Sequence, residues 1–305
     1  MSGPRIPVGS RESHSGRLGP NGSGTDSPTT LRSNSKGTRA GGRRQYVTRA
    51  QADAVAQRMS TRDQQLVSDI HRVQIMTGQQ LRRLHYENTA AGRRLARLDL
   101  ARLVDWRVLA RLERRIGGVR AGSDGYVYSL DALGQRLSVP GKRRYRAPWT
   151  PGAPFLRHAV AVAELYTQLR ERGATTDLLA FDAEPICWRR FTGPGGRQLI
   201  LKPDAFVICA DHDFEFRYFI EVDCSTESLP RITSKAQIYT RYWLSGREQA
   251  RTEIFPEVLW ITPDDARRES IVQALIHTDA EHWKLFAVVT ERRAVDYMLG
   301  SGDAK

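Results

Sequence analysis

The chain has 305 residues, 40% of them hydrophobic, which is enough for one large core or two smaller ones. No segment approaches the ~20 consecutive apolar residues that span a bilayer, and the N-terminus lacks the apolar stretch of a secretory signal. We therefore expect a soluble, cytoplasmic protein without a membrane partner.

The net charge of +13 is unevenly distributed along the chain. Residues 1–147 hold 28 Lys and Arg against 11 Asp and Glu, whereas residues 148–305 hold 19 against 23. A basic half is suited to neutralising phosphates, and an acidic half is suited to binding a metal near phosphate. The three cysteines lack the short spacings of zinc ligands, so we expect small buried residues at Cys187, Cys209 and Cys224.

Residues 1–47 are rich in Gly, Ser, Arg, Pro and Thr and contain almost no large apolar side chains. Such a segment cannot bury enough surface to offset its ordering entropy, so we expect a disordered basic tail. The tail either adds nonspecific affinity for nucleic acid or has no role.

Residues 48–138 have the outline of a winged helix. Ser60 is a predicted N-cap before a helix that contains Leu66 and Ile70. A short helix over 77–84 and a third helix follow, with Leu95, Leu98 and Leu103 at core spacing. Two predicted strands, 109–115 and 126–130, are joined by a Gly-rich segment. Three helices followed by a hairpin are typical of winged helices, whose third helix enters the major groove.

On this interpretation a set of side chains on the third helix faces DNA: Thr89, Arg93, Arg94 and Arg97. Two alternatives stay open, a solvated helix face and a winged helix that binds protein. Residues 139–154 combine prolines with a basic run and form a predicted linker. We also expect Lys142, Arg143 and Arg144 in this linker to contact the phosphate backbone.

Residues 155–296 predict a second domain, followed by a short tail over 297–305. An amphipathic helix over 155–172 precedes strands over 178–191, around Asp204 and around Glu221. A helix with Lys235, a strand (257–262), a helix (265–276) and a strand (285–289) complete it. This order predicts an α+β fold whose mixed sheet has parallel pairing at its far edge.

Carboxylates in two of these strands predict a metal site. Glu221 and Asp223 are two residues apart, so both lie on one face of a strand, and Asp204 on the neighbouring strand joins them if it faces the same way. Hard cations such as Mg²⁺ or Mn²⁺ take carboxylate oxygens together with substrate phosphates. Lys235 would then orient or deprotonate a water molecule for attack on phosphate. Only 6 of the 47 basic residues are lysines, which favours a specific role for Lys235.

The pair Pro203-Asp204, followed by Glu221-x-Asp223 and Lys235, resembles the PD-(D/E)xK or restriction-endonuclease-like superfamily. The motif lysine is here replaced by Asp223, and Lys235 on the next helix fits a migrated lysine. Over roughly residues 48–290 the arrangement is similar to the replication-relaxation family of actinobacterial plasmids and mobile elements. The resemblance implies a winged helix followed by a restriction-endonuclease-like domain, with Glu164 on the first core helix as a further metal ligand. We interpret His158 on that helix as a structural histidine.

Two classes of function follow from the resemblance and the acids. The first is a metal-dependent DNA nuclease or nickase that acts in plasmid or mobile-element replication or transfer. The second is a DNA-binding replication or transfer factor, or a transcriptional regulator, whose nuclease-like domain is inactive. A homodimer, or a complex with other replication or transfer proteins, is left open.

Overall fold

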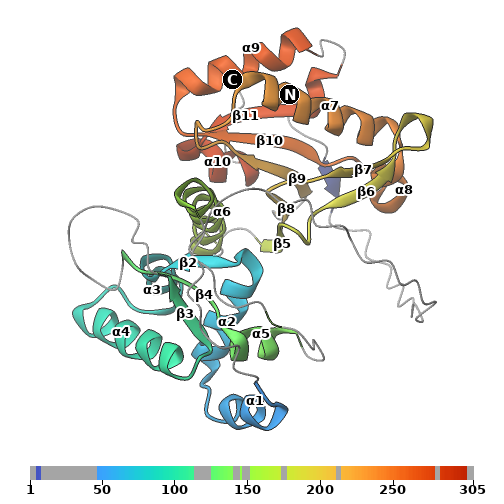
Figure 1. Cartoon of the computed structure of the whole chain (residues 1–305). Coiled ribbons are helices and arrows are strands. Elements are labelled where there is room, and N and C mark those ends of the chain that lie inside the picture. Colours follow the sequence, from blue (N-terminus) through green and yellow to red (C-terminus); the bar gives the residue numbers. More distant parts are fainter. Residues whose placement is uncertain are drawn as a thin grey trace.

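The computed structural model describes residues 47–112, 125–139, 145, 152–172, 177–210, 214–278 and 282–300, together with the backbone of Arg5–Pro7. The described part is a mixed α+β structure of two units that meet at one long helix, α6 (Figure 1). Several predicted features lie outside the described residues: most of the tail over 1–47, the tip of the predicted hairpin, and Lys142, Arg143 and Arg144.

The first unit packs helices around a three-stranded antiparallel sheet of order β2-β4-β3. Ser60 and Asp63 cap the start of its second helix reciprocally, as expected for a Ser N-cap. Its elements are α1 (Arg49–Ala56), α2 (Thr61–Val73), β2 (Ile75–Thr77), α3 (Gly78–His85), α4 (Ala90–Asp105), β3 (Leu109–Leu112), β4 (Val127–Leu130) and α5 (Ala132–Ser138).

The core face of α4 is not the predicted one. Leu103 is buried as expected, but Leu95 is 40% exposed and Leu98 is 57% exposed. The buried face lies further round the helix, where the small residues Gly92 and Ala96 accompany Leu100 and Leu103. A Cβ atom at Gly92 would lie 2.2 Å from the carbonyl oxygen of Glu87, so this tightly packed face accepts only glycine there. Leucines lie on both sides of α4, and close backbone packing selects the side with the small residues.

The second unit contains α6 and a mixed sheet of order β11-β10-β9-β8-β5. Strands β9, β10 and β11 are parallel, which confirms the predicted parallel edge, and β8 is antiparallel to both β9 and β5. The elements are α6 (Ala153–Glu171), β5 (Asp177–Ala183), β6 (Arg189–Thr192), β7 (Gln198–Leu201), β8 (Ala205–Ala210), β9 (Phe214–Val222), α7 (Leu229–Leu244), α8 (Arg247–Thr252), β10 (Glu257–Thr262), α9 (Asp265–Thr278), β11 (Phe286–Thr290) and α10 (Glu291–Met298).

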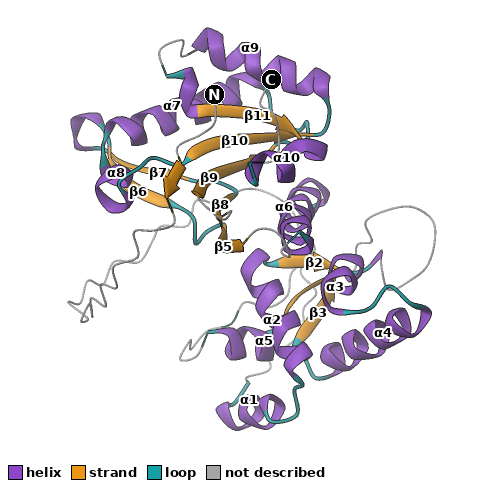
Figure 2. Ribbon diagram, turned by 180° about the vertical axis from the view of Figure 1, so that it is seen from behind, coloured by secondary structure: helices purple, strands orange, loops and turns teal. Residues whose placement is uncertain are grey.

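Helices cover both faces of this sheet (Figures 1 and 2). Phe219 of β9 and Trp260 of β10 pack in one cluster with residues of α7 and α9, whereas Ile220 and Leu259 pack in another with α6 and α10. This alternation is the period of two expected of strands buried on both faces. Among the described helices, none has the length and apolar composition that a membrane span needs.

Two predictions from the sequence are wrong, one about the extent of a strand and one about the tail. The strand expected over 178–191 ends at Ala183, because the turn that follows contains Pro185, which cannot donate to a strand ladder. The expected disorder of the tail is wrong for Arg5–Pro7, which forms β1 and pairs antiparallel with Phe214–Phe216 of β9. β10 pairs with β9 only from Tyr218 onward. Without β1, the start of β9 would therefore form an exposed sheet edge on that side.

Helix α6 lies between the two units in both ribbon views and holds them together (Figures 1 and 2). Gln80 and Arg83 of α3 donate to Glu164 of α6 at 3.0 and 2.6 Å. Tyr166 of α6 donates to the buried carboxylate of Asp69 of α2 at 2.6 Å. Asp69 also pairs with two more groups, His85 of α3 and Arg170 of α6.

We predict that Asp69→Ala lowers the free energy of unfolding by about 3 kcal/mol, because the change leaves buried partners without their shared acceptor. Asp53→Ala is the control: Asp53 is exposed and makes one 3.8 Å pair with Arg49, so its loss should cost about 0.5 kcal/mol or less. Urea unfolding at pH 7 measures both. Equal stability of the two variants would contradict a central role of Asp69.

Candidate functional site

Asp204 and Glu221 lie side by side on adjacent antiparallel strands. Asp204 directly precedes β8, and its neighbour Ala205 pairs with Ile220, the residue before Glu221. Asp204 Oδ2 accepts a 2.7 Å hydrogen bond from the Val222 amide, which fixes the carboxylate against β9. Asp204 is 8% exposed and Glu221 2% exposed. The structure therefore brings two of the predicted acids together at a buried position.

Helix α7 supplies both partners of Glu221. Lys235 Nζ and the Tyr239 hydroxyl each donate to the Glu221 carboxylate at 2.8 Å. The two donors are four residues apart and therefore share a helix face, as the sequence predicts. Burial, together with the charge of Asp204, raises the pKa of Glu221 to about 7, although Lys235 and Tyr239 favour its ionised form.

Lys235 is a cation in this arrangement. Burial opposes its charged form, but the carboxylates of Glu221, Asp204 and Glu227 outweigh burial and raise the pKa of Lys235 above its usual value. A permanently protonated lysine can hold a water molecule or a phosphate, but it cannot accept a proton. Of the two predicted roles, the arrangement therefore favours orientation of a water molecule over its deprotonation.

His158 of α6, which we interpret from the sequence as a structural histidine, lies beside Asp204. Its Nε2 lies 3.1 Å from Asp204 Oδ1. Burial opposes its protonation, but hydrogen bonds to Asp204 and Cys224 prevail and raise the pKa of His158 to about 10. The sequence shows a histidine on a helix that is expected to pack on the sheet. No sequence spacing relates His158 to Asp204. Each of the two acids thus has a cationic partner from a different helix.

Asp223 does not join the other two acids. It follows the last residue of β9, and its carboxylate pairs with Arg267 of α9 at 2.6 and 3.1 Å. The expectation that three carboxylates converge is wrong for Asp223, because a two-point contact with a guanidinium neutralises it. Arg267 lies 44 residues further along the chain, so no local sequence pattern indicates this pair.

Glu164 does not join them either. Its carboxylate faces the first unit, where it accepts from Gln80, Arg83 and the neighbouring Gln168. The expected metal ligand on the first core helix is therefore a contact between the two units. His158, nearly two turns earlier on the same helix, is the α6 residue that reaches Asp204.

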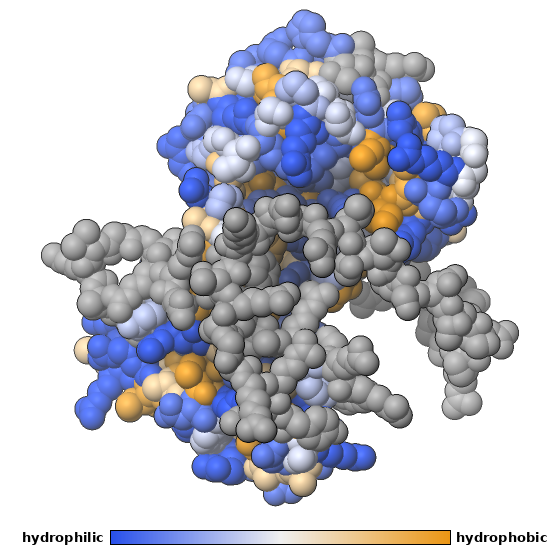
Figure 3. All heavy atoms as spheres, viewed as in Figure 1, coloured by the Kyte–Doolittle hydropathy of each residue, from blue (hydrophilic) through white to orange (hydrophobic). Residues whose placement is uncertain are grey.

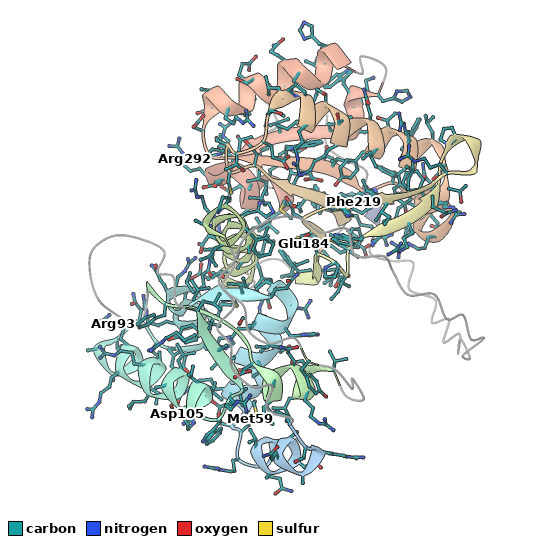
Figure 4. All side chains as sticks on the ribbon, in the orientation of Figure 1. Met59, Arg93, Asp105, Glu184, Phe219 and Arg292 are labelled. Atoms are coloured by element: carbon teal, nitrogen blue, oxygen red, sulfur yellow. The ribbon has the colours of Figure 1, made fainter. Side chains whose placement is uncertain are left out.

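Glu184 lies where the first unit meets the site (Figure 4). Burial, and then the charge of Asp204, raise the pKa of its carboxyl, while His158 and Lys235 lower it. Its amide donates to the Asp204 carbonyl at 3.1 Å, and its own carbonyl accepts from Gln74 of the first unit. Glu184 thus places one more carboxyl group near Asp204, in addition to that of Glu221.

The donor set suits a hard cation with few protein ligands. Mg²⁺ is commonly held by one or two carboxylates, with water and substrate phosphates as the remaining ligands. Asp204 and Glu221 provide two carboxylates from adjacent strands. Within the described ranges no group of three or more His, Cys, Asp or Glu side chains has a metal-binding arrangement. A cation at this pair would need phosphate or water to complete its shell.

The predicted DNA-facing residues lie at or near the start of α4. Thr89 is the N-cap, and its hydroxyl accepts from the Gly92 amide at 3.0 Å. Arg93, Arg94 and Arg97 are exposed, and in the described part of the chain none of them makes an ion pair (Figure 4 labels Arg93). With respect to the described residues, the three guanidinium groups remain available to an anionic partner.

Comparison with known proteins places part of the chain in a family. Residues 67–258 match a protein-family model described as replication-relaxation. No curated protein and no solved structure gives a significant match. The matched segment runs from α2 to the start of β10 and so includes Asp204, Glu221 and Lys235.

We predict that Glu221→Gln removes part of the pH dependence of stability. Because folding raises the pKa of Glu221 from 4.5 to about 7, the folded protein holds a proton between these values that the unfolded chain releases. The contribution of Glu221 to stability is therefore complete below pH 4.5 and is lost as the pH rises through 7. The stability of Glu221→Gln relative to wild type should rise between pH 5 and 8 in urea unfolding, and parallel pH profiles would contradict this.

Proposed function

The chain belongs to the replication-relaxation family, and from this premise we propose that it is a DNA-binding protein of plasmid or mobile-element replication or transfer that nicks DNA. The proposed site is the pair Asp204 and Glu221 with Lys235, acting with Mg²⁺ or Mn²⁺.

One observation carries the proposal: two acids are buried side by side, with an ammonium group 2.8 Å from one of them. Burying charges without a task is costly, and replacing a buried ion pair by apolar residues is often neutral or stabilising. In phosphodiester hydrolysis, carboxylates can hold a divalent cation that activates water. An ammonium group beside them can position the water or the phosphate. The presence of this costly set supports a catalytic rather than a structural use.

Each residue has a distinct task in this proposal. Asp204 and Glu221 hold the divalent cation, which when bound lowers the pKa of a water molecule and neutralises phosphate charge. Lys235 positions the attacking water or a phosphate oxygen through its ammonium group. His158 acts as a positioning residue, because its contact with Asp204 Oδ1 restrains that carboxylate, whose Oδ2 accepts from the Val222 amide.

The first unit supports the DNA-binding part of the proposal. The order of its elements supports a winged helix with α4 as the third helix of the motif: a helix, a short strand, two helices and two paired strands. The exposed Arg93 and Arg97 of α4 supply positive charge that phosphate contacts require. The contacts of α6 with α2 and α3 hold this unit at a fixed position beside the site.

A second candidate function has its own support. Lys235 and His158 already neutralise the two acids, and Asp223 is occupied by Arg267. These pairs fit an inactive nuclease-like domain that serves as a DNA-binding platform for replication, transfer or transcription. The two functions differ in whether purified protein breaks DNA.

We predict that purified protein converts supercoiled plasmid to open circles with Mg²⁺ or Mn²⁺ and that chelator stops the reaction. Asp204→Asn, Glu221→Gln and Lys235→Met should each lower the nicking rate by at least about 100-fold, because each removes charge that the transition state needs. DNA affinity should stay near that of wild type.

Glu257→Gln is the matched control for Glu221→Gln. Glu257 is also a strand glutamate, is 9% exposed, and has a pKa that burial raises to about 7, although Tyr297 donates to it. It bonds to α10, on the other face of the sheet from α7, so its loss should leave nicking intact. Binding without nicking by wild type, with several DNA substrates, would favour the inactive platform.

We predict that changing Arg93 and Arg97 together to Gln weakens DNA binding and makes it less dependent on salt. Each lost phosphate contact should lower the slope of log affinity against log salt by ~0.9. Arg268→Gln on α9 is the control, because Arg268 pairs with its helix neighbours Asp265 and Glu269. Fluorescence anisotropy across a salt series measures the slope, and an unchanged slope would remove α4 from the DNA interface.

A further inference from the structure

The outward face of α4 carries four exposed residues at a coiled-coil spacing. Arg94, Leu98, Ala101 and Asp105 follow one another at intervals of four, three and four residues. At ~3.6 residues per turn they form one stripe along the helix, on the side opposite the buried face. Leu98 is 57% exposed in the middle of this stripe.

Apolar surface continues beside the stripe. Leu95 is 40% exposed, and a shallow hollow is lined by Ala90, Ala91, Arg94, Leu95 and Leu98. Helix α4 lies on the outside of its unit, away from α6, and orange and cream surface lies among blue surface there (Figures 1 and 3). Leu95 and Leu98 line the same hollow and so form one apolar patch, and an exposed apolar patch rimmed by polar residues can mark a contact surface.

The two ends of the stripe carry opposite charges. Arg94 is near its start and Asp105 at its end, eleven residues or ~16 Å apart along the helix. Within the described residues neither side chain makes an ion pair or a hydrogen bond with another side chain. A stripe that is basic at one end, apolar in the middle and acidic at the other end is complementary to its own inverted copy.

We propose that α4 pairs antiparallel with α4 of a second copy of the chain. A twofold axis midway along the stripe sets Arg94 of each copy against Asp105 of the other. The same axis sets Leu98 against Ala101, whose small side chain lets the helices approach. A parallel pair would oppose like charges, so the pattern specifies the antiparallel direction and a closed dimer.

Pairing through the outward face keeps that face of α4 out of the major groove and leaves one flank of the helix for contacts with DNA phosphates. Adjacent residues are ~100° apart around a helix, so Arg93 and Arg97 lie on a flank away from Leu98. The pairing covers Arg94 and leaves this flank of each copy exposed. The proposal does not depend on nicking, and it assigns Arg94 to the partner subunit rather than to DNA.

The experiment is sedimentation equilibrium of the full chain, with a charge exchange. We expect wild type to show a concentration-dependent dimer that weakens with salt. Arg94→Asp and Asp105→Arg should each weaken dimerisation about tenfold, because the symmetry places each change in two ion pairs. The double variant restores opposite charges and should recover the wild-type dissociation constant. Leu98→Gln should abolish the dimer.

All three positions are exposed, so circular dichroism and thermal unfolding should match wild type and exclude misfolding. A monomeric wild type at every concentration would overturn the proposal, as would single charge reversals that leave the dimer unchanged. A monomer in which Arg94→Asp weakens DNA binding would show that the face contacts DNA instead.

Discussion

The burial of Asp204 and Glu221 on adjacent strands is the constraint on which the second unit depends. Desolvated carboxylates are unfavourable unless cations or hydrogen-bond donors compensate them. The compensation comes from both sides of the sheet: α7 provides Lys235 and Tyr239 to Glu221, and α6 provides His158 to Asp204. The acids therefore favour the positions that both helices take. Burial raises the pKa of Glu221. Neighbouring carboxylates raise the pKa of Lys235, and hydrogen bonds to Asp204 and Cys224 raise that of His158, in both cases against the effect of burial.

Helix α6 also connects this chemistry to the first unit. One part of it reaches Asp204 through His158, and another part bonds to α2 and α3 through Tyr166 and Glu164. The segment over 139–154 is a linker by composition, yet the units that flank it share buried polar contacts. A DNA duplex held by the first unit would therefore meet the acids in a defined geometry.

Local pattern predicted much of this fold and less of the site. The Ser60 cap, helix α7 and the parallel pair β10 and β11 follow from sequence spacing, because capping, periodicity and connection rules act over short distances. The pairs of Asp223 with Arg267 and of His158 with Asp204 join residues more than forty positions apart. Strand alternation places Asp223 near Glu221, but it cannot reveal an arginine on a later helix. The face that α4 buries was likewise decided by tertiary packing around Gly92.

The most direct test of the central claim is whether the pair Asp204 and Glu221 binds a divalent cation. Mn²⁺ can be followed by electron paramagnetic resonance in the presence of a short DNA duplex whose phosphorothioate linkages resist cleavage. The account predicts one bound Mn²⁺ per chain, lost in Asp204→Asn and retained in Glu257→Gln. Absence of bound Mn²⁺ in wild type, with DNA bound, would contradict it and would leave Lys235 and His158 as permanent partners of two inactive acids.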